Sequence, residues 1–366
     1  MTAIGTNIGI PFNKKTGLWS RYWTSRYPSD LEVIVDSDTQ ITLNWVNNGV
    51  ADFTGISIER SDDDGDTYSE IDTVINTATT YTDTGLTPGV TYYYRIRYYL
   101  TEGTIYDDDL VTFIDGLSTE LSTEELTLLN SFILTIKEGF SIDTLAEGFD
   151  ALWIIAGETK EESYRNLAKR DHDISEQAGG RWVQHEGVDG SIGAEILHSD
   201  YIPSVDKVVA TLNDNSFGCY LRKDRATNNT LNPMGVISTV TGSAHRIIPF
   251  RSTNYLFAYN NSNGLTYARM TSTDTLGMFC SNRIASDNVR AGKNKVFSDV
   301  DTNPSVALPD KEMWLMTYNN NGSAGGYETS QLSFAWIGKG LDQTKWECLC
   351  DAFETYMDAK GKGVIA

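Results

Sequence analysis

Apolar and polar side chains alternate strictly in two stretches of the N-terminal third of the chain. Tyr92, Tyr94 and Ile96 occupy every second position of one stretch, and Ile41 and Trp45 belong to a similar stretch upstream. Successive side chains of a strand point to opposite faces of a sheet, so a period of two predicts half-buried β-strands. We therefore expect a β-structure in which one face of each strand packs into a core.

Turn signals separate these strands. Asp63 and Gly65 lie in an Asp-Asp-Gly-Asp run that precedes Tyr68, and such a run between two strands is typical of a hairpin turn. A second turn, Leu-Thr-Pro-Gly at 86–89, leads directly into the strand that holds Tyr92. The N-terminal third thus predicts a series of short antiparallel strands.

Residues 28–117 resemble a fibronectin type III domain. Trp45 falls on the buried tryptophan of that family's second strand, and the run from Leu86 to Tyr92 falls on its tyrosine-corner motif. The resemblance implies an immunoglobulin-like sandwich in which the Tyr92 hydroxyl bonds a backbone group a few residues upstream. Domains of this family bind and space other domains and rarely catalyse reactions.

A helical period replaces the alternation after this domain. Ser122 and Glu125 form a capping-box pattern, and the apolar residues from Leu126 to Ile136 recur every three to four positions before Gly139. We expect a linking helix within residues 118–144 that ends at Gly139 and packs its apolar side under the next domain.

The C-terminal part returns to short apolar runs separated by Asn, Gly, Ser and Asp turns, which predict a β-sandwich or barrel. A capping box at Thr159 and Glu162 predicts one short helix. A final helix is expected from Asp342 to about Lys360, closed by Gly361. The predicted strands cover residues 151–156, 193–196, 207–212, 217–221, 235–240, 255–259, 278–280 and 314–318.

The order of motifs over residues 145–366 resembles the concanavalin-A-like (lectin-type) jelly roll of tail- and fibre-associated proteins of tailed bacteriophages. The resemblance implies a jelly-roll sandwich that ends in a helix and is displayed on a virion. The motifs are Phe-Asp-Ala-Leu-Trp at 149–153, Asn166, His-Asp-Ile at 172–174, Trp-Val-Gln-His-Glu-Gly at 182–187, Tyr-Ile-Pro at 201–203, Asn-Asn at 260–261, Ser-Asn-Arg at 281–283 and Leu-Ser-Phe-Ala-Trp-Ile-Gly at 332–338.

Residues 1–27 carry Trp19, Tyr22, Trp23 and Tyr27 in a segment too short for a core of its own. Aromatic side chains are enriched where a segment docks onto a partner. The opening Ile-Gly-Ile-Pro-Phe run, followed by these aromatics, also resembles the start of virion proteins from phages of gut bacteria. We expect an N-terminal segment that attaches to other virion proteins; the alternative is that it folds back on its own chain.

Composition narrows the classes of partner. The chain has 366 residues, enough for two to three domains, and 29 basic against 50 acidic residues give a net charge of −21. A nucleic acid or an anionic membrane surface would be repelled by this charge. No apolar run reaches the roughly 18 residues that span a bilayer, so we expect no membrane insertion. The first residues show no basic segment followed by an apolar run, so we expect no secretory leader, and we expect no disulfide framework from the four scattered cysteines. We expect synthesis in the reducing cytoplasm of a bacterial host.

Catalytic patterns are sparse. A glycosidase needs two carboxylates about 5–10 Å apart beside a sugar site, and no predicted strand carries the Glu-x-Asp-x-x-Glu pattern of jelly-roll glucanases. His172, His185, His198 and His245 have no metal-ligand spacing, and no nucleophile elbow, Walker loop or Gly-x-Gly-x-x-Gly motif is present. We expect no catalytic residues, no metal site and no cofactor.

Calcium is the one ion that the sequence leaves open. Asp299, Asp301 and Asn303 begin like a calcium loop, but Pro304 occupies the position at which an EF-hand needs glycine. An EF-hand is excluded, and a structural calcium site from these oxygens, with Asp310, is the alternative.

Loop amides and aromatic side chains of the C-terminal sandwich are the candidate contacts to a glycan or a partner. Asn260, Asn261, Tyr318, Asn320 and Tyr327 carry suitable groups. Asparagine also tolerates left-handed backbone conformations, so the Asn residues equally suit ordinary turns. The sequence leaves both roles open.

Together these features predict a mainly β, non-enzymatic virion structural protein. It would be a head or tail fibre subunit, attached through residues 1–27, displayed on the virion surface and in contact with host-surface polysaccharide. Sustained heptads and collagen-like repeats are absent, so a homo-oligomer, a dimer or trimer, would form through domain surfaces. The alternative is a carbohydrate-active enzyme with an accessory fibronectin domain. A bacterial surface adhesin is a third hypothesis, and the absence of a leader weighs against it.

Overall fold

The computed structural model describes residues 2–5, 28–47, 55–99, 106–177, 181–191, 193–224, 231–251 and 254–365. Within this part the protein is mainly β, and its chain divides into two compact units, Met1–Val111 and Thr112–Ala366. The predicted attachment residues Trp19, Tyr22, Trp23 and Tyr27 lie outside the described residues.

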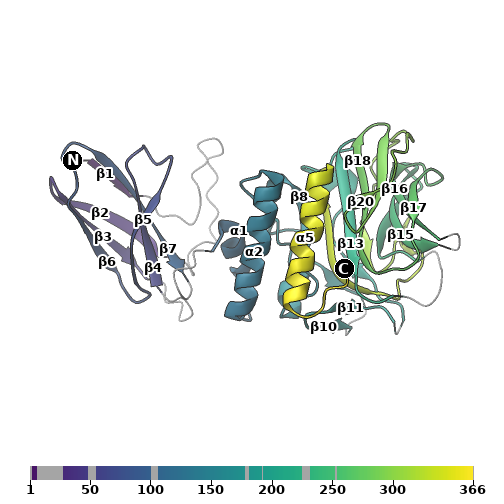
Figure 1. Ribbon diagram of the computed structural model, residues 1–366, viewed down its shortest axis with the longest axis horizontal. Helices are drawn as coiled ribbons and strands as arrows, with labels where there is room; N and C mark the ends of the chain where they lie inside the picture. The colour runs from purple at the N-terminus through teal and green to yellow at the C-terminus, as the bar shows by residue number, and fades with distance from the viewer. Residues whose placement is uncertain are drawn as a thin grey trace. The chain divides into compact units, whose positions relative to one another are not determined.

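The N-terminal unit is a sandwich of two sheets, as the sequence predicts (Figure 1). The buried residues include Ile41 and Leu43 from one sheet and Tyr94 and Ile96 from the other, and each of the four is at most 1% exposed. One sheet has the order β2 (Ser29–Ser37), β3 (Gln40–Val46), β6 (Thr80–Thr84), and the other has the order β1 (Thr2–Gly5), β7 (Thr91–Tyr99), β4 (Gly55–Ser61), β5 (Ser69–Ile75).

The predicted tyrosine corner forms. Tyr92 is buried, and its hydroxyl accepts a hydrogen bond from the backbone N–H of Thr87 at 3.1 Å. Tyr93 points to the opposite face and donates to Asp64 at 3.2 Å. Trp45 is 4% exposed inside the sandwich. The predicted hairpin is confirmed as well, since β4 and β5 pair antiparallel across the turn.

The edge of this sandwich beside β7 is occupied by the start of the chain. β1 pairs with β7 in parallel, with Ala3 opposite Tyr92. In immunoglobulin-like sandwiches a strand that follows β7 in the chain borders this position. In the described residues after β7, the chain instead enters helix α1 (Asp108–Ile114). The N-terminal strand thus completes the sheet.

The C-terminal unit has three layers: two β-sheets and a layer of helices (Figure 1). We call the sheet that contacts the helices the inner sheet. Its strands pair in the order β10-β11-β24-β13-β18-β19-β20, and β8 also pairs with β24. They are β8 (Phe149–Trp153), β10 (Trp182–Val183), β11 (Gly187–Asp189), β13 (Asn215–Leu221), β18 (Gly277–Ala285), β19 (Asn288–Lys293), β20 (Val296–Phe297) and β24 (Gln331–Gly338).

The outer sheet covers the other face of the inner sheet. Its order is β17-β16-β15-β14-β21-β12-β9, with β22 beside β14 and β23 beside β22. Its strands are β9 (Ser175–Glu176), β12 (Leu197–His198), β14 (Met234–Ser238), β15 (Ser243–Arg251), β16 (Tyr255–Ser262), β17 (Ala268–Thr271), β21 (Trp314–Leu315), β22 (Asn319–Asn320) and β23 (Ser323–Ala324). Phe217, Ile337, Ile247 and Leu256 lie in the core between the two sheets.

Two long helices, α2 (Thr123–Phe140) and α5 (Gln343–Ala359), lie side by side against the inner sheet (Figure 1). Phe334 of β24 contacts Phe132 of α2 with ring centroids 6.0 Å apart and stacks on Phe353 of α5 at 4.4 Å. Trp336 approaches Trp346 of α5 at 6.0 Å. The inner sheet is therefore covered on both faces, which explains why every residue of β13 and β24 is buried. Shorter helical segments are η1 (Leu145–Glu147), α3 (Lys160–Tyr164) and α4 (Pro203–Asp206).

The predicted capping residues at the starts of α2 and α3 are confirmed, and the end of α2 differs from the prediction. The Ser122 hydroxyl accepts from the Glu125 N–H at 3.2 Å and starts α2, and the Thr159–Glu162 capping box is complete. The end predicted at Gly139 is wrong: α2 continues to Phe140, and Ser141, with a left-handed φ of 54°, closes it. No helix among the described residues has the length and hydropathy to cross a membrane.

Two predicted strands are absent. Residues 207–212 form irregular structure, because the backbone N–H groups of Val208, Val209 and Ala210 bond the carboxylate of Asp150 and cannot serve a sheet. Residues 194–196 are also irregular, and the strand in this region is the short β12 that follows.

Candidate functional site

Asn260 and Asn261, which the sequence suggested for an exposed loop, lie inside the sandwich. They are 1% and 0% exposed, because β16 runs on through both of them to Ser262. The Asn261 amide donates to the Leu212 carbonyl at 2.7 Å and bonds the ring of His245, whose pKa burial lowers to about 3. The loop placement of both asparagines is wrong, and burial keeps their side chains from a surface glycan.

Tyr318, Asn320 and Tyr327 lie at or near the surface beside the outer sheet. Tyr318 and Tyr327 are half-buried, and Asn320 in β22 is exposed. Contact between these residues and a ligand stays a prediction. Tyr318 differs from the other two because it joins a larger group of aromatic side chains.

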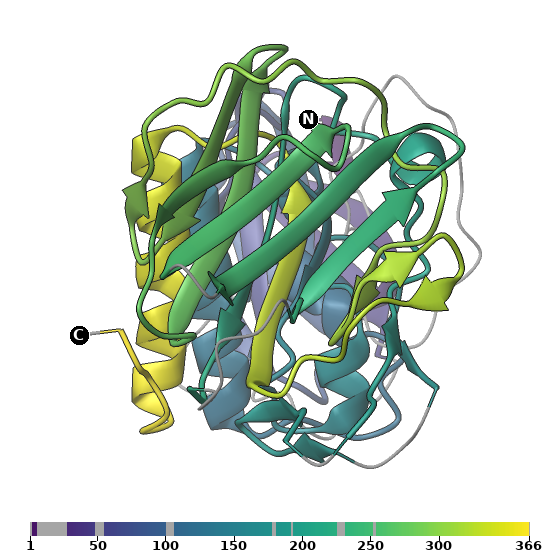
Figure 2. The same ribbon diagram turned by 90° about the vertical axis from the view of Figure 1, so that its right-hand side faces the viewer.

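This group lies on the side of the outer sheet that faces away from the core; Figure 2 shows the sheet face on. Leu256 and Ala258 of β16 belong to the core between the sheets, so the alternating Tyr255, Phe257 and Tyr259 project the other way. We use the name aromatic face for Tyr255, Phe257, Tyr259, Tyr267 and Tyr318 together with Arg246 and Arg269.

Contacts between neighbouring rings and guanidinium groups connect the aromatic face. Arg246 pairs with Tyr259 across β15 and β16, and its guanidinium carbon lies 4.5 Å from the Tyr259 ring and 4.9 Å from the Tyr318 ring. Tyr267 packs against Tyr259 at 5.3 Å and against Phe257 at 4.6 Å. At the other end Arg269 lies over Tyr255 at 5.0 Å. The rings thus form one surface with an arginine toward each end.

Two glycines make room for this arrangement. Gly235 of β14 is opposite Arg246, and a Cβ there would lie 3.0 Å from Cγ of Arg246. The Tyr318 ring packs on the backbone of Gly325, where a Cβ would lie 2.0 Å from the ring. A larger residue at position 325 would displace the Tyr318 ring, and one at position 235 would crowd both the His245 carbonyl and the Arg246 side chain.

The guanidinium of Arg246 contacts aromatic rings but lacks hydrogen-bond acceptors among the described residues. Within the described residues Arg246 has no carboxylate partner, and its buried Nε has no hydrogen-bond acceptor. Cation–π contacts with two tyrosines hold the guanidinium. Such a surface can stack against the apolar face of a sugar ring and can donate hydrogen bonds to an anion.

The aromatic face continues across the sheet to a His–Glu–Trp cluster. Trp314 is opposite Gly235, and His198 is opposite Trp314, so both point away from the core like Arg246. Glu312 accepts from the Trp314 indole N–H at 2.8 Å and pairs with Nδ1 of His198 at 3.0 Å. These groups satisfy one another and fix the indole in place.

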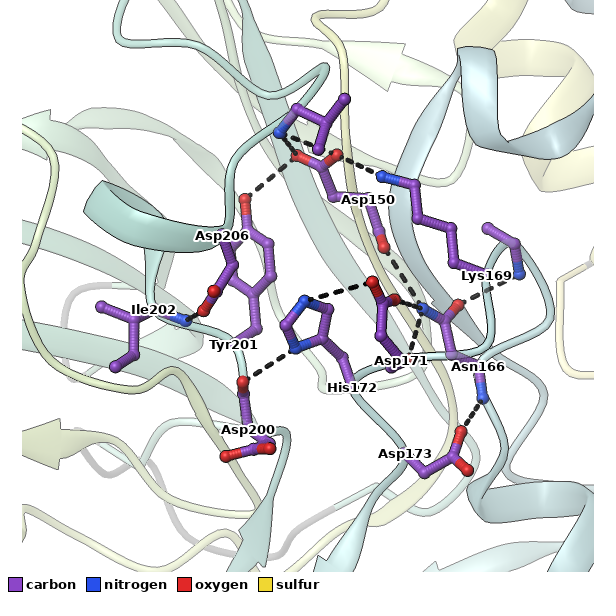
Figure 3. Close-up of polar contacts among 12 residues, drawn as sticks. Asp150, Asn166, Lys169, Asp171, His172, Asp173, Asp200, Tyr201, Ile202 and Asp206 are labelled. Atoms are coloured by element: carbon purple, nitrogen blue, oxygen red, sulfur yellow. Dashed lines mark hydrogen bonds and ion pairs between the residues drawn. The ribbon is translucent and has the colours of Figure 1, made fainter. Parts of the chain in front are cut away.

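A second polar cluster surrounds the buried carboxylate of Asp150 in β8 (Figure 3). Lys169 donates to it at 2.8 Å and the Tyr201 hydroxyl at 3.1 Å, and the three amides of residues 208–210 donate at 3.0–3.1 Å. Burial by itself would raise the pKa of Asp150, but Lys169 and the amides outweigh it and hold the pKa below its usual range. The carboxylate is saturated with donors.

Asn166 and His172 extend the same cluster (Figure 3). The Asn166 side chain accepts from the Leu152 N–H at 2.9 Å and donates to the Asp150 carbonyl at 3.2 Å, and Nδ1 of His172 bonds the Asp200 carbonyl at 2.8 Å. Together with Tyr201, the structure therefore brings together residues from four of the sequence motifs. The Asn166 contacts tie its loop to β8 and the His172 contact ties one loop to another, so the cluster holds the fold.

Arg283, from the Ser-Asn-Arg motif, has a similar structural role. It is fully buried, and its guanidinium donates to the backbone carbonyls of Asn260, Ser286 and Asn303. Asn282 beside it donates to the carbonyl of Leu341 and accepts from the N–H of the same residue, each at 2.8 Å. These motifs anchor loops and the start of α5.

A cleft of about 410 Å³ lies on the C-terminal unit. Its two carboxylates already hold backbone: Glu161 accepts from the Ser118 N–H, and Asp173 accepts from the Asn166 N–H at 2.8 Å. Neither is placed for acid–base work on a bound sugar. The cleft is lined by Lys160, Glu161, Tyr164, Arg165, Asp173 and Ile174.

The carboxylates considered for calcium lie in separate settings. Asp301 bonds the backbone and amide of Asn303, and Asp310 accepts from the Ser238 hydroxyl. Within the described residues no group of three or more His, Cys, Asp or Glu side chains is arranged to hold a metal ion.

Comparison with known proteins identifies the N-terminal unit. Residues 26–106 match the fibronectin type III domain family. The chain contains a fibronectin type III domain. Among solved structures, the fn3 domain of human contactin 1 is 16% identical, with a TM-score of 0.19, over 21% of this chain and 66% of that chain. A Fn3-like protein from Clostridium thermocellum is 35% identical, with a TM-score of 0.17, over 19% of this chain and 71% of that chain. No curated protein matches the chain.

Sequence reasoning missed most of the aromatic face. The alternation of Tyr255, Phe257 and Tyr259 was visible and predicts three aromatics on one side of a strand. Tyr318 is among the contacts that the sequence suggested, but its position beside Arg246 carries no local signal. Arg246 carries none either, because it meets Tyr259 only through the pairing of β15 with β16.

Proposed function

We propose that this protein is a non-catalytic virion structural protein, a head or tail fibre subunit that contacts glycans of the host surface through its C-terminal sandwich. The fibronectin type III domain would act as a spacer, and residues 1–27 would attach the subunit to other virion proteins. The C-terminal sandwich would be a concanavalin-A-like jelly roll, and the subunit would work as a dimer or trimer on the particle surface.

The observation that carries the proposal is the aromatic face. Half-buried Tyr255, Tyr267 and Tyr318 present rings on the solvent side of the outer sheet, and Arg246 lies between two of the rings. Aromatic and arginine side chains dominate the energetics of recognition surfaces. The saturated Asp150 cluster and the occupied carboxylates of the cleft favour binding over hydrolysis. The motif order and the acidic composition support the virion context.

A pair of tyrosine substitutions tests the binding role. Tyr318→Ala removes a ring from the aromatic face, whereas Tyr81→Ala removes a half-buried tyrosine of the fibronectin type III domain. Loss of one stacking ring should weaken binding to polysaccharide from gut bacteria about 2- to 10-fold, as measured by affinity electrophoresis. Equal affinities of the two variants, or weaker binding by Tyr81→Ala, would contradict the assignment of the face.

A further inference from the structure

We propose that the aromatic face recognises an acidic sugar, with the guanidinium of Arg246 binding its anionic group. This inference rests on the proposed function, because it names the class of glycan that the same surface takes. It concerns the guanidinium of Arg246, which contacts two tyrosine rings and has no carboxylate partner among the described residues.

Arg246 differs from most arginines of this acidic chain. Arg60 pairs with Asp83 at 2.9 Å and Arg170 pairs with Asp115 at 2.6 Å, and buried Arg283 is held by carbonyl groups. Arg246 has only the two tyrosine rings as partners among the described residues, and its Nε is buried without an acceptor. In the part of the chain that the structure describes, no carboxylate pairs with Arg246, although the sequence has 50 acidic residues.

The contacts of Arg246 leave its hydrogen-bonding edge for a ligand. A ring in a cation–π contact lies against the face of the guanidinium, whereas the N–H groups point outward in its plane. Rings therefore cannot satisfy those donors. A carboxylate or a sulfate can, and a carboxylate accepts two parallel N–H bonds from one guanidinium. Nε is closed to solvent, so an anion would accept from the terminal N–H groups of the half-buried Arg246 side chain.

The tyrosine rings beside Arg246 favour an acidic sugar as the ligand over a free anion. Tyr255 and Tyr267 offer half-buried rings beside the charge, and exposed Arg269 over Tyr255 supplies a second cation. A polysaccharide with an acidic group on successive units could contact both arginines across the rings. The net charge of −21 repels polyanions in general. That repulsion is screened beyond about 8 Å at physiological salt, so contacts on this face decide which polyanion binds.

The test uses the full-length protein and three polymers: alginate, which carries carboxylates, dextran sulfate, which carries sulfate esters, and neutral dextran. Arg246→Gln removes the charge while keeping a polar side chain. Arg290→Gln is the matched control, because Arg290 also has an unpaired Nε and lies over an aromatic ring, that of Phe297, on the inner sheet. We expect Arg246→Gln to weaken binding of the acidic polymer about 10- to 100-fold in calorimetric titrations, and Arg290→Gln to leave it unchanged.

The outcomes separate the two proposals. Binding of alginate alone assigns a carboxylate and binding of dextran sulfate alone assigns a sulfate; either, lost in Arg246→Gln, supports the inference. Equal affinity of Arg246→Gln and the unsubstituted protein for the acidic polymer overturns it. Binding confined to neutral dextran also overturns it but leaves the proposed function standing, whereas failure to bind these polymers and polysaccharides of gut bacteria overturns both. If Arg246→Gln does not fold, competition on the unsubstituted protein decides: galacturonate should displace bound alginate, and displacement by galactose at equal concentration would contradict the inference.

Discussion

Buried polar side chains in this protein act as anchors for backbone. Asp150 and Arg283 bond main-chain groups of loops elsewhere in the sequence, and Asn166, itself in a loop, bonds the main chain of β8. Because a buried charge or amide without partners is costly, each of these residues forces its loop into one conformation. Arg246 departs from this pattern, since rings are its only partners in the described chain. The contrast separates structural polar residues from a candidate for recognition.

Removing the Tyr92 hydroxyl should destabilise the fibronectin domain measurably. Tyr92→Phe leaves the backbone N–H of Thr87 without the hydroxyl of the buried Tyr92 as its acceptor, so we expect a loss of about 1–2 kcal/mol in the free energy of unfolding. Tyr93→Phe removes an exposed bond to Asp64 and should cost much less. Urea denaturation of residues 1–111 measures both, and equal losses would contradict the tyrosine corner.

The Asp150 cluster should make stability depend on acid pH. The pKa of Asp150 lies below its usual value, so the folded state binds fewer protons and the stabilisation is present above about pH 4. It is lost as pH falls through the lowered pKa. Asp150→Asn should cost about 3–5 kcal/mol at pH 7, because Lys169 loses its charged partner. Urea denaturation at pH 7 and pH 3 should show this difference shrinking in acid; a constant difference would contradict the argument.

At the scale of elements, sequence periodicity predicted strands and helices correctly where one side of the element is buried. The alternation in β3 and β7 and the helical spacing in α2 and α5 match the structure, because local side-chain direction and core packing agree there. The prediction of a strand at residues 207–212 is wrong because backbone N–H groups of this segment bond Asp150, which is far away in the sequence. The Asn260–Asn261 pair is predicted in a loop because two adjacent asparagines are typical of turns. In the structure the pair lies inside strand β16.

The β3 strand carries a direct test of the sandwich. Trp45→Ala should destabilise the N-terminal unit by about 3–5 kcal/mol, because it empties a large volume of the core. Urea denaturation of residues 1–111, followed by circular dichroism, measures the change. A loss below about 1 kcal/mol would mean that the indole contributes little to the packing between the sheets.

The contact between α2, α3 and α5 contains two neighbouring acidic side chains. Burial raises the pKa of Glu162 well above its usual range, and nearby Glu125, which bonds Tyr356 and Lys360 of α5 and its C-terminal end, raises it further. The folded state therefore holds the proton more tightly than the unfolded state does. Stability should fall as pH rises from about 4.5 toward the raised pKa.

Glu162→Gln tests this contact, because glutamine keeps the carbonyl oxygen that accepts from the N–H groups of Glu158 and Thr159. The variant should unfold at a higher temperature than the unsubstituted protein at pH 8 and at a similar temperature at pH 4. Differential scanning calorimetry at the two pH values measures both. A variant that is less stable at pH 8 would show that the Glu162 carboxylate is ionised and stabilising.

At the scale of the whole molecule, the start of the chain has two roles in our account. Residues 2–5 complete the fibronectin sheet as β1, and the aromatic residues that follow are proposed to attach the subunit to the virion. A deletion of the whole segment would disturb both. Replacing Trp19 and Trp23 by alanine leaves β1 unchanged, so the double variant should keep its circular dichroism spectrum. Its incorporation into particles, measured by immunoblot of purified virions, should fall at least about 10-fold, which corresponds to a loss of about 1.4 kcal/mol in binding free energy. Undiminished incorporation would contradict the attachment role.

The central claim is that the C-terminal sandwich binds a surface polysaccharide without cleaving it. Its most direct test incubates the purified full-length protein with polysaccharide from gut bacteria and follows bound protein and newly released reducing ends in the same sample. Our account predicts saturable binding that weakens in Tyr318→Ala, with the number of reducing ends unchanged over time. A steady release of reducing ends that is lost when one carboxylate of the C-terminal unit is replaced would contradict it and identify a carbohydrate-active enzyme.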